Sequence, residues 1–492
     1  MFLNYIFLGS HNNNSTQDVK RSITNNIREE ISMSNDYQLV EPINISSWID
    51  WALYPFITGN GSDLNPFIIE NIEIIGDGVK TIQSGNDTLL DSTYVGIYIN
   101  TNGSFIIQNC KISHISIGIL LSIGISSGGP TYPIVNVEIN DCSIGIYSRW
   151  QHVAVNISNC NIRNCNWVSI TASVDINNYI NYGGIGICVR SSAGIIEDCR
   201  IEDCSVGMMA GLLQDFHNNQ LINCGFIPDY LFMFMMDYDS SNTVNGKPIG
   251  IFGSYWGDDN MVFTQANASQ YGQLIFAVCP NLTLSDIHIT EPCSIGIQLL
   301  SVSLNQRTYL NNIICENQKL GFYIHGYDMI GENLYAKNCD AGFYFVDIKN
   351  CNLTKIMTDN TDIPIYAITA TLNCNIETEQ YTKFYLVDPY AWYGDKLYVE
   401  TAGSSYNITM SYISELGVQG YACQFNDTGI YRVSLTVLTY TVTANFTVIS
   451  VPRYPRPVVS GIIPSYPLFW VWTGLMIGVI VCIESYRRGR RR

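Results

Sequence analysis

A short glycine-centred string recurs along most of this 492-residue chain. The string reads Gly-apolar-x-apolar, and successive copies lie about 21 to 27 residues apart, or about twice that where one copy is missing. A repeat of this length, without room for a long helix, is typical of a solenoid whose turns stack on one another. The glycines are Gly96, Gly118, Gly145, Gly186, Gly207, Gly250, Gly296, Gly321 and Gly342.

A polar corner precedes several of these glycines at a nearly constant offset. It is seen in IIQNCKI around Cys110, ISNCNI around Cys160 and IIEDCRI around Cys199. Apolar residues alternate on both sides of the corner, which predicts short strands separated by tight turns. We therefore predict a right-handed parallel β-helix over residues 48–375. We expect the corner Asn residues to stack into a ladder, and the glycines to supply the backbone freedom of another bend.

Cysteines occupy positions of this pattern that should face the interior. Stacked on neighbouring turns they would lie about 4.8 Å apart, which overlaps the range that permits disulfides. Buried thiols are the interpretation we favour, because Cys packs as a small hydrophobe, and the disulfide alternative stays open. Sparse histidines and the lack of C-x-x-C predict no metal and no cofactor. These cysteines are Cys110, Cys142, Cys160, Cys165, Cys199, Cys204, Cys293 and Cys339.

Longer alternating strands replace the repeat after residue 375, as in KFYLVDPYAWYGDKLYVETAG and GIYRVSLTVLTYTVTANFTVISV. They predict a small antiparallel β-sandwich over residues 376–451. The sequence from Asp427 to Tyr431 (DTGIY) resembles the tyrosine corner of immunoglobulin-like domains. Val433 stands where an antibody-type domain carries its second cysteine, so the standard disulfide is not expected.

The C-terminal end predicts a membrane anchor. Residues 452–465 are rich in Pro and read as a stalk. Residues 466–486 contain the uncharged run LFWVWTGLMIGVIVCI with aromatic residues near both ends, which predicts one transmembrane helix, a buried helix being the alternative. The arginines of residues 487–492 place that tail in the cytoplasm and the rest of the chain outside the cell.

We interpret residues 1–47 as a cap with a truncated signal, since MFLNYIFLGS is apolar but short. The fold class is all-β with this single helix.

From residue 44 onward, eleven N-x-S/T sequences are compatible with the extracellular assignment and are candidate glycosylation sites. They begin at Asn44, Asn60, Asn86, Asn102, Asn156, Asn267, Asn281, Asn352, Asn407, Asn426 and Asn445.

Three stretches carry a resemblance to a known family. They are GNGSDLNPFIIENIEI from Gly59, NTVNGKPI from Asn242 to Ile249, and GQLIFAVCPNLTLSDIHI from Gly272. On these stretches the chain resembles archaeal cell-surface proteins with right-handed parallel β-helix repeats, the group that also contains NosD-type periplasmic proteins. The resemblance covers about residues 48–374. It implies the fold and does not transfer any chemistry.

The net charge and the composition of the chain limit the classes of binding partner that we expect. The formal net charge is -17, so nucleic acid is an unexpected partner. We expect a binding or structural role at the cell surface, toward glycans or other surface proteins. Aromatic residues that could be exposed and stack on sugars are Tyr255, Trp256, Tyr323, Tyr327 and Tyr344, the alternative being that they pack in the interior, as most aromatic residues of a β-rich chain do.

A polysaccharide lyase or glycoside hydrolase on the outer face of the coil is the alternative. Its weak signals are Asn360-Thr361-Asp362 and Gly257-Asp258-Asp259, which turn chemistry also explains. A lyase would need acids beside a cation; within the repeats the candidates are Asp198, Glu202 and Asp203 with Arg149, Arg163, Arg190 and Arg200. No catalytic residue can be assigned from these patterns.

Overall fold

The computed structural model describes the chain between Tyr37 and Ile449, with gaps. The described residues are 37–78, 94–101, 103–123, 131–148, 154–166, 184–189, 194–210, 214–228, 237–238, 240–253, 260–279, 281–300, 307–368, 373–379, 382–387, 396–402, 404–409, 411–413, 418–437 and 440–449. The predicted stalk, transmembrane helix and cytoplasmic tail lie outside them, as do residues 1–36. In the part that is described, no helix is long and apolar enough to cross a membrane.

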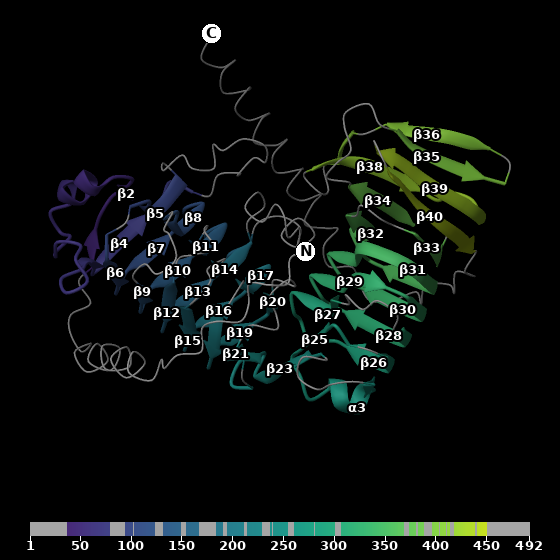
Figure 1. The fold of residues 1–492 in the computed structure, drawn as a ribbon, viewed down its shortest axis with the longest axis horizontal. Coiled ribbons are helices and arrows are strands. Elements are labelled where there is room, and N and C mark those ends of the chain that lie inside the picture. Colours follow the sequence, from purple (N-terminus) through teal and green to yellow (C-terminus); the bar gives the residue numbers. More distant parts are fainter. Residues whose placement is uncertain are drawn as a thin grey trace, which may run out of the picture. The chain divides into compact units, whose positions relative to one another are not determined.

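The first part of the chain winds into turns of three short strands (Figure 1). Each strand pairs in parallel, without a shift of register, with the equivalent strands of the turns before and after it. Sheet one holds β3 (Phe67–Glu70), β6 (Phe105–Gln108), β9 (Tyr132–Val135), β12 (Val155–Ser158), β15 (Gly194–Glu197), β18 (Gln214–His217) and β21 (Asp237–Tyr238). Sheet two holds β1 (Gln38–Leu39), β4 (Ile72–Ile75), β7 (Lys111–Ser113), β10 (Glu138–Asn140), β13 (Asn161–Arg163), β16 (Arg200–Glu202), β19 (Gln220–Ile222) and β22 (Thr243–Val244). Sheet three holds β2 (Ile43–Ile45), β5 (Val95–Ile99), β8 (Ile117–Leu121), β11 (Ile144–Ser148), β14 (Ile185–Val189), β17 (Val206–Ala210) and β20 (Phe226–Pro228).

After an antiparallel hairpin between β22 and β23, each turn uses two longer strands. One stack holds β23 (Lys247–Phe252), β25 (Gln273–Ala277), β27 (Ile295–Leu300), β29 (Leu320–Tyr327), the start of β31 (Ala341–Asp359), β32 (Ile363–Ile368) and β34 (Lys383–Val387). The other holds β24 (Val262–Phe263), β26 (Thr283–Ile289), β28 (Thr308–Glu316), β30 (Met329–Lys337), the end of β31, and β33 (Asn373–Glu379). Two short helices interrupt the coil, η1 (Trp48–Leu53) and α3 (Gln265–Ala268). The prediction of a right-handed parallel β-helix is confirmed.

Asn and Asp residues make the corners, as predicted. Asn109 and Asn136 have φ of 51° and 53°, the left-handed region that Asn and Asp enter more readily than most residues. Their side chains stack along the axis, because Asn136 Nδ2 donates to Asn109 Oδ1 at 2.7 Å. The same contact links Asn360 Nδ2 to Asn338 Oδ1 at 3.0 Å. The ladder therefore gives hydrogen-bond partners to the side-chain amides of the residues at which the chain bends.

The predicted reason for the repeat glycines was wrong. Gly118 is the second residue of β8, and its φ does not lie in the left-handed region. A Cβ atom built on Gly118 would lie 2.6 Å from the carbonyl oxygen of Gly145 and 3.0 Å from Cγ2 of Ile139. Glycine is needed because the next turn lies too close for any side chain.

The cysteines named from the sequence are all buried and carry free thiols in this structure. Cys142, Cys165 and Cys204 occupy equivalent corner positions on neighbouring turns, since β10, β13 and β16 pair in register. Burial raises the pKa of the Cys142 thiol to about 12. A thiol with so high a pKa is a poor nucleophile and packs as an apolar group.

Antiparallel strands continue directly from the end of the coil. They are β35 (Lys396–Thr401), β36 (Ser405–Thr409), β37 (Ser411–Ile413), β38 (Val418–Gln424), β39 (Gly429–Val437) and β40 (Tyr440–Ile449). β33 spans the predicted boundary at residue 375 and pairs in parallel with both β31 and β40. Phe384 and Phe446 pack in one core with residues of the preceding turns.

The tyrosine-corner geometry is present within these strands. The Tyr431 hydroxyl donates to the Asp427 carbonyl oxygen at 3.0 Å and accepts from the Asp427 amide at 3.2 Å. This is the contact by which such a tyrosine holds the chain ahead of its strand. The immunoglobulin-like assignment of residues 376–451 stays a prediction.

Replacing Gly118 with Ala should lower the free energy of unfolding by about 1–3 kcal/mol, because backbone on the next turn has to move. Gly331→Ala is the matched control, since its new Cβ would meet the movable ends of Leu353 and Leu334. Urea unfolding followed by circular dichroism measures both variants. Equal losses in the two would contradict the steric role of Gly118.

Candidate functional site

A polar groove follows one corner of the coil. It is a hollow of about 430 Å³ lined by Asn166, Asp203, Cys204, Asn223, Pro292, Asn317, Gln318, Lys319, Asn338 and Asp340. Four of these residues, Asp203, Asn223, Asn317 and Asn338, have φ between 51° and 61° and so occupy left-handed corners. The groove therefore arises from the corner ladder itself, repeated on successive turns.

Hydrogen bonds along the ladder orient these side chains. Asn223 Nδ2 donates to Asp203 Oδ1 at 2.9 Å, and Asn338 Nδ2 donates to Asn317 Oδ1 at 3.4 Å. The side chain of Lys319 pairs with Asp340 at 3.5 Å. A side-chain amide has two N–H donors and an acceptor oxygen with two lone pairs. The Asn338 side chain also donates to Glu316 Oε1 at 3.5 Å and accepts from Asn360 Nδ2 at 3.0 Å. Asn223 therefore keeps more side-chain capacity for a ligand than Asn338 does. Asn223 and Asn338 are both exposed. The groove offers a row of donors and acceptors with little net charge.

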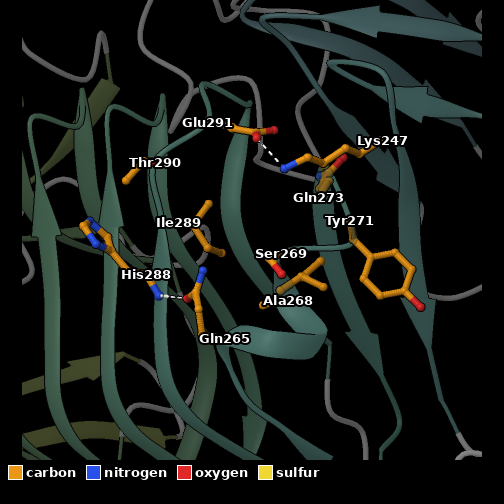
Figure 2. Close-up of a pocket in the computed structure, with 12 residues that line it drawn as sticks. Lys247, Gln265, Ala268, Ser269, Tyr271, Gln273, His288, Ile289, Thr290 and Glu291 are labelled. Atoms are coloured by element: carbon orange, nitrogen blue, oxygen red, sulfur yellow. Dashed lines mark hydrogen bonds and ion pairs between the residues drawn. The ribbon is translucent and has the colours of Figure 1, made fainter.

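A second, smaller hollow of about 90 Å³ lies beside α3. Figure 2 shows Lys247 of β23 and Glu291, just after β26, turned toward each other, and they form an ion pair. Gln265 of α3 accepts the backbone N–H of His288 through Oε1 at 2.6 Å, and the His288 ring points away from Gln265 (Figure 2). Tyr271 lines the same hollow. Sequence reasoning missed this site because its residues come from separate segments and form no known motif.

His288 also begins a chain of polar side-chain contacts on the outer face of the coil. Its Nε2 lies 3.1 Å from Glu316 Oε2, and Lys337 Nζ lies 2.8 Å from Glu316 Oε1. The hydrogen bond from Lys337 is the main reason that the pKa of Glu316 is lowered, with a further contribution from His288. A carboxyl group with a lowered pKa is suited to stay ionised and is a poor general acid.

The acids and cations proposed for a lyase have structural partners. Arg200 pairs with Glu202 at 3.0 Å, and Asp203 accepts the Asn223 ladder bond. Asp198 has a φ of 54° and forms a corner. Arg163 binds Glu138 at 2.5 Å. Arg149 and Arg190 lie outside the described residues. The structure thus uses the described members of this set in turns and surface ion pairs.

Of the two short motifs considered for glycoside hydrolysis, the structure describes the one at Asn360-Thr361-Asp362. Asn360 is a corner residue with a φ of 50°, and the Thr361 hydroxyl donates to the Asp359 carbonyl oxygen at 3.2 Å. Turn formation accounts for both the backbone conformation of Asn360 and the hydrogen bond of Thr361. Residues 257–259 lie outside the described part of the chain.

Two of the aromatic residues considered for stacking on sugars pack in the interior instead. Tyr323 and Tyr344 are each 1% exposed, and their rings pack against each other with centroids 5.3 Å apart. Their strands are apolar on both faces, a pattern typical of parallel strands buried on both sides. Tyr327 is half-buried, and Tyr255 and Trp256 lie outside the described residues.

The predicted glycosylation sites differ in accessibility. Exposed ones are Asn60, Asn267, Asn281, Asn352, Asn407, Asn426 and Asn445. Asn44 and Asn156 are half-buried, and Asn156 Oδ1 accepts the Ile195 amide at 3.1 Å. Asn86 and Asn102 lie outside the described residues. Glycosylation itself stays a prediction.

Within the described ranges no group of three or more His, Cys, Asp or Glu side chains could hold a metal ion. The fold defines the chain as an all-β parallel β-solenoid. No protein-family model, no curated protein and no solved structure matches it. The family resemblance drawn from the repeat stretches therefore stays an expectation.

Lys337→Met should raise the pKa of Glu316 toward its ordinary value of 4.5, because the largest lowering contact is lost. The Glu316 carboxylate contributes stability that is present above about pH 4.5 and lost as the pH falls through its lowered folded pKa. Between neutral and acidic pH, the melting temperature of the variant should therefore fall by less than that of the parent protein. Thermal unfolding across pH tests this.

Lys355→Met is the control for this titration. Lys355 forms an equivalent contact with Glu332 at 2.7 Å but is not among the causes of the Glu316 shift. Carboxyl carbon chemical shifts from a nuclear magnetic resonance titration would identify Glu316 directly. An unchanged Glu316 pKa in Lys337→Met would contradict the assignment.

Proposed function

We propose that this chain is a non-catalytic extracellular binding protein, anchored in the membrane by residues 466–486, whose corner groove holds a glycan. The groove of about 430 Å³ is the observation that carries the proposal. Sugars are rich in hydroxyl groups, each of which donates and accepts, and a row of amides with a few charged neighbours matches them. Ordered water molecules can also bridge sugar hydroxyls to these side chains, with little loss of binding energy.

The repeated geometry also favours an elongated ligand. Parallel strands lie about 4.8 Å apart, so equivalent side chains on successive turns form a regular row along the axis. A solenoid presents such extended surfaces for binding. A linear glycan can contact several turns at once, which lets weak contacts add together.

The cellular setting is part of the same proposal. The apolar run and arginine tail at the C-terminus support a single-pass anchor with the coil outside the cell. Residues 376–451, as an immunoglobulin-like sandwich, and the Pro-rich residues 452–465 would act as spacers. Exposed N-x-S/T sequences such as Asn352 and Asn407 agree with a glycoprotein.

A polysaccharide-active enzyme is the second candidate, and the hollow beside α3 favours it. Lys247, Glu291, His288 and Tyr271 contribute a cation, a carboxylate, an imidazole and a phenol to the lining of one hollow. Against it, Lys247 is held by Glu291, and Glu316, which contacts His288, has a lowered pKa. We therefore rank binding above catalysis.

The binding test uses a glycan array followed by calorimetry on the best linear glycan. Asn223→Gly with Asn338→Gly removes two groove amides while glycine keeps the left-handed corners. If each amide contributes about 0.5–1.5 kcal/mol, Kd should rise by about tenfold.

Asn109→Gly with Asn136→Gly is the matched control. These residues also occupy left-handed corners and share a ladder bond, but they do not line the groove. Binding should be unchanged in this control. Equal affinity in all variants would place the ligand elsewhere. New reducing ends or unsaturated products from the parent protein would overturn the non-catalytic proposal.

A further inference from the structure

The exposed apolar side chains beyond the first turn of the coil lie beside N-x-S/T sequences. Eleven large hydrophobic residues are exposed in the described chain, and five of them come after residue 75. Four of these five are register partners of a residue of such a sequence on the neighbouring strand, and the fifth, Tyr309, is the register partner of one of the four. In two of the four pairs the partner is the asparagine itself. The four pairs are Val262 with Thr283, Ile330 with Asn352, Tyr398 with Asn407, and Ile430 with Thr447.

One of these sites lies on the antiparallel pair of β35 and β36 (Figure 1), in which Tyr398 is directly opposite Asn407. Residues opposite each other in such a pair share one face and have Cβ atoms about 4.5–5.5 Å apart. Tyr398 is 39% exposed, and both Asn407 and Thr409 of the N-x-S/T sequence are exposed. A group attached to the Asn407 side chain is therefore within reach of the Tyr398 ring.

The other site is a row of three residues across β28, β30 and β31. Tyr309, Ile330 and Asn352 occupy the same register position on these strands, and all three are exposed. The residues before and after each of them are buried, so the three side chains share the outer face. Neighbouring strands lie about 4.8 Å apart. Ile330 is therefore one strand and Tyr309 two strands from the Asn352 amide.

The small size of these two patches argues against a protein partner. A stable interface buries about 800 Å² on each partner, and one or two partly exposed side chains offer far less. The row is polar on both sides, since Thr283 precedes Tyr309 and Asn375 follows Asn352. An occupant attached covalently beside the patch needs no large interface, because its effective concentration there is high.

We propose that Asn352 and Asn407 carry N-linked glycans whose first sugars lie on the neighbouring apolar side chains. A pyranose ring has C–H bonds on its faces, which gain dispersion energy on an aliphatic side chain or an aromatic ring. The glycan on Asn407 lies on Tyr398, and the glycan on Asn352 lies on Ile330 and reaches Tyr309. This inference rests on the proposed placement of the coil outside the cell and is independent of the glycan groove.

The attachment is a group transfer from a lipid-linked oligosaccharide phosphate. The asparagine side-chain nitrogen forms a bond to C1 of the sugar, while the bond between C1 and the phosphate oxygen breaks. The nitrogen loses one proton, and the phosphate leaves with the bonding electrons. The hydroxyl residue that the sequence requires is present at Thr354 and at Thr409.

Mass spectrometry and hydroxyl-radical footprinting of the full chain test the proposal. The protein is produced with an added signal peptide in a eukaryotic host that glycosylates secreted proteins, and its peptides should carry a sugar at Asn352 and at Asn407. Hydroxyl radicals oxidise exposed side chains, and a sugar that lies on a ring protects it. Tyr398 should be oxidised severalfold faster in Asn407→Gln than in the parent protein, and Tyr309 severalfold faster in Asn352→Gln. Each variant is the matched control for the other, because it removes only one of the two glycans.

Two changes at Thr409 separate the effect of the sugar from that of the substitution. Thr409→Ser keeps the N-x-S/T sequence and should leave Tyr398 protected, whereas Thr409→Ala destroys the sequence and should expose Tyr398. Enzymatic removal of the glycans from the folded parent protein should expose both tyrosines without any substitution.

The outcomes distinguish this inference from the placement outside the cell. Sugars at both sites with unchanged oxidation of Tyr398 and Tyr309 would overturn the proposed packing. Sugars only at other sequences, such as those at Asn60 and Asn267, would overturn the choice of sites. Both results leave the placement standing, whereas a chain without any sugar would contradict the placement and the inference together.

Discussion

In-register stacking of successive turns is the constraint on which the rest of this protein depends. Each strand of sheet three pairs residue for residue with the next, as Ile119 does with Ile146 and Ile146 with Ile187. A slip of one residue would turn the apolar set of a strand to the other face. Every position of the repeat must therefore suit the equivalent position above and below it. This explains the uniform glycines, the isoleucine columns and the stacked cysteines.

The same constraint separates the structural from the binding surfaces. Strands such as β5 and β8 are buried along their whole length. Polar side chains with spare hydrogen-bonding capacity gather instead at the corners, where Asn and Asp take left-handed backbone conformations. The groove is thus a by-product of the way the chain turns. An elongated glycan there would use residues that the fold requires anyway.

The buried pair Asn219 and Asn242 shows how strictly the stacking is observed. Asn219 follows a corner at the position that Cys199 takes one turn earlier. Its Nδ2 donates to Asn242 Oδ1 at 2.9 Å and to the Ile196 carbonyl oxygen at 2.8 Å. A polar group enters the core here only because its neighbour on the next turn is polar too. One amide alone would leave buried atoms unpaired.

The sequence by itself determined the solenoid, its corner Asn ladder and its buried cysteines, because each of these repeats at a constant offset and the physics of one turn applies to all. Only the tertiary structure decided why Gly118 is glycine, since the clash is with a carbonyl on the next turn. It also decided that Tyr323 is buried, since alternation along one strand does not show whether the outer face is covered. The hollow beside α3 is the feature that could be found only from the tertiary structure. Lys247 and Glu291 meet across a turn of the coil that interrupts the repeat, and no periodic pattern predicts where such an irregular turn leads.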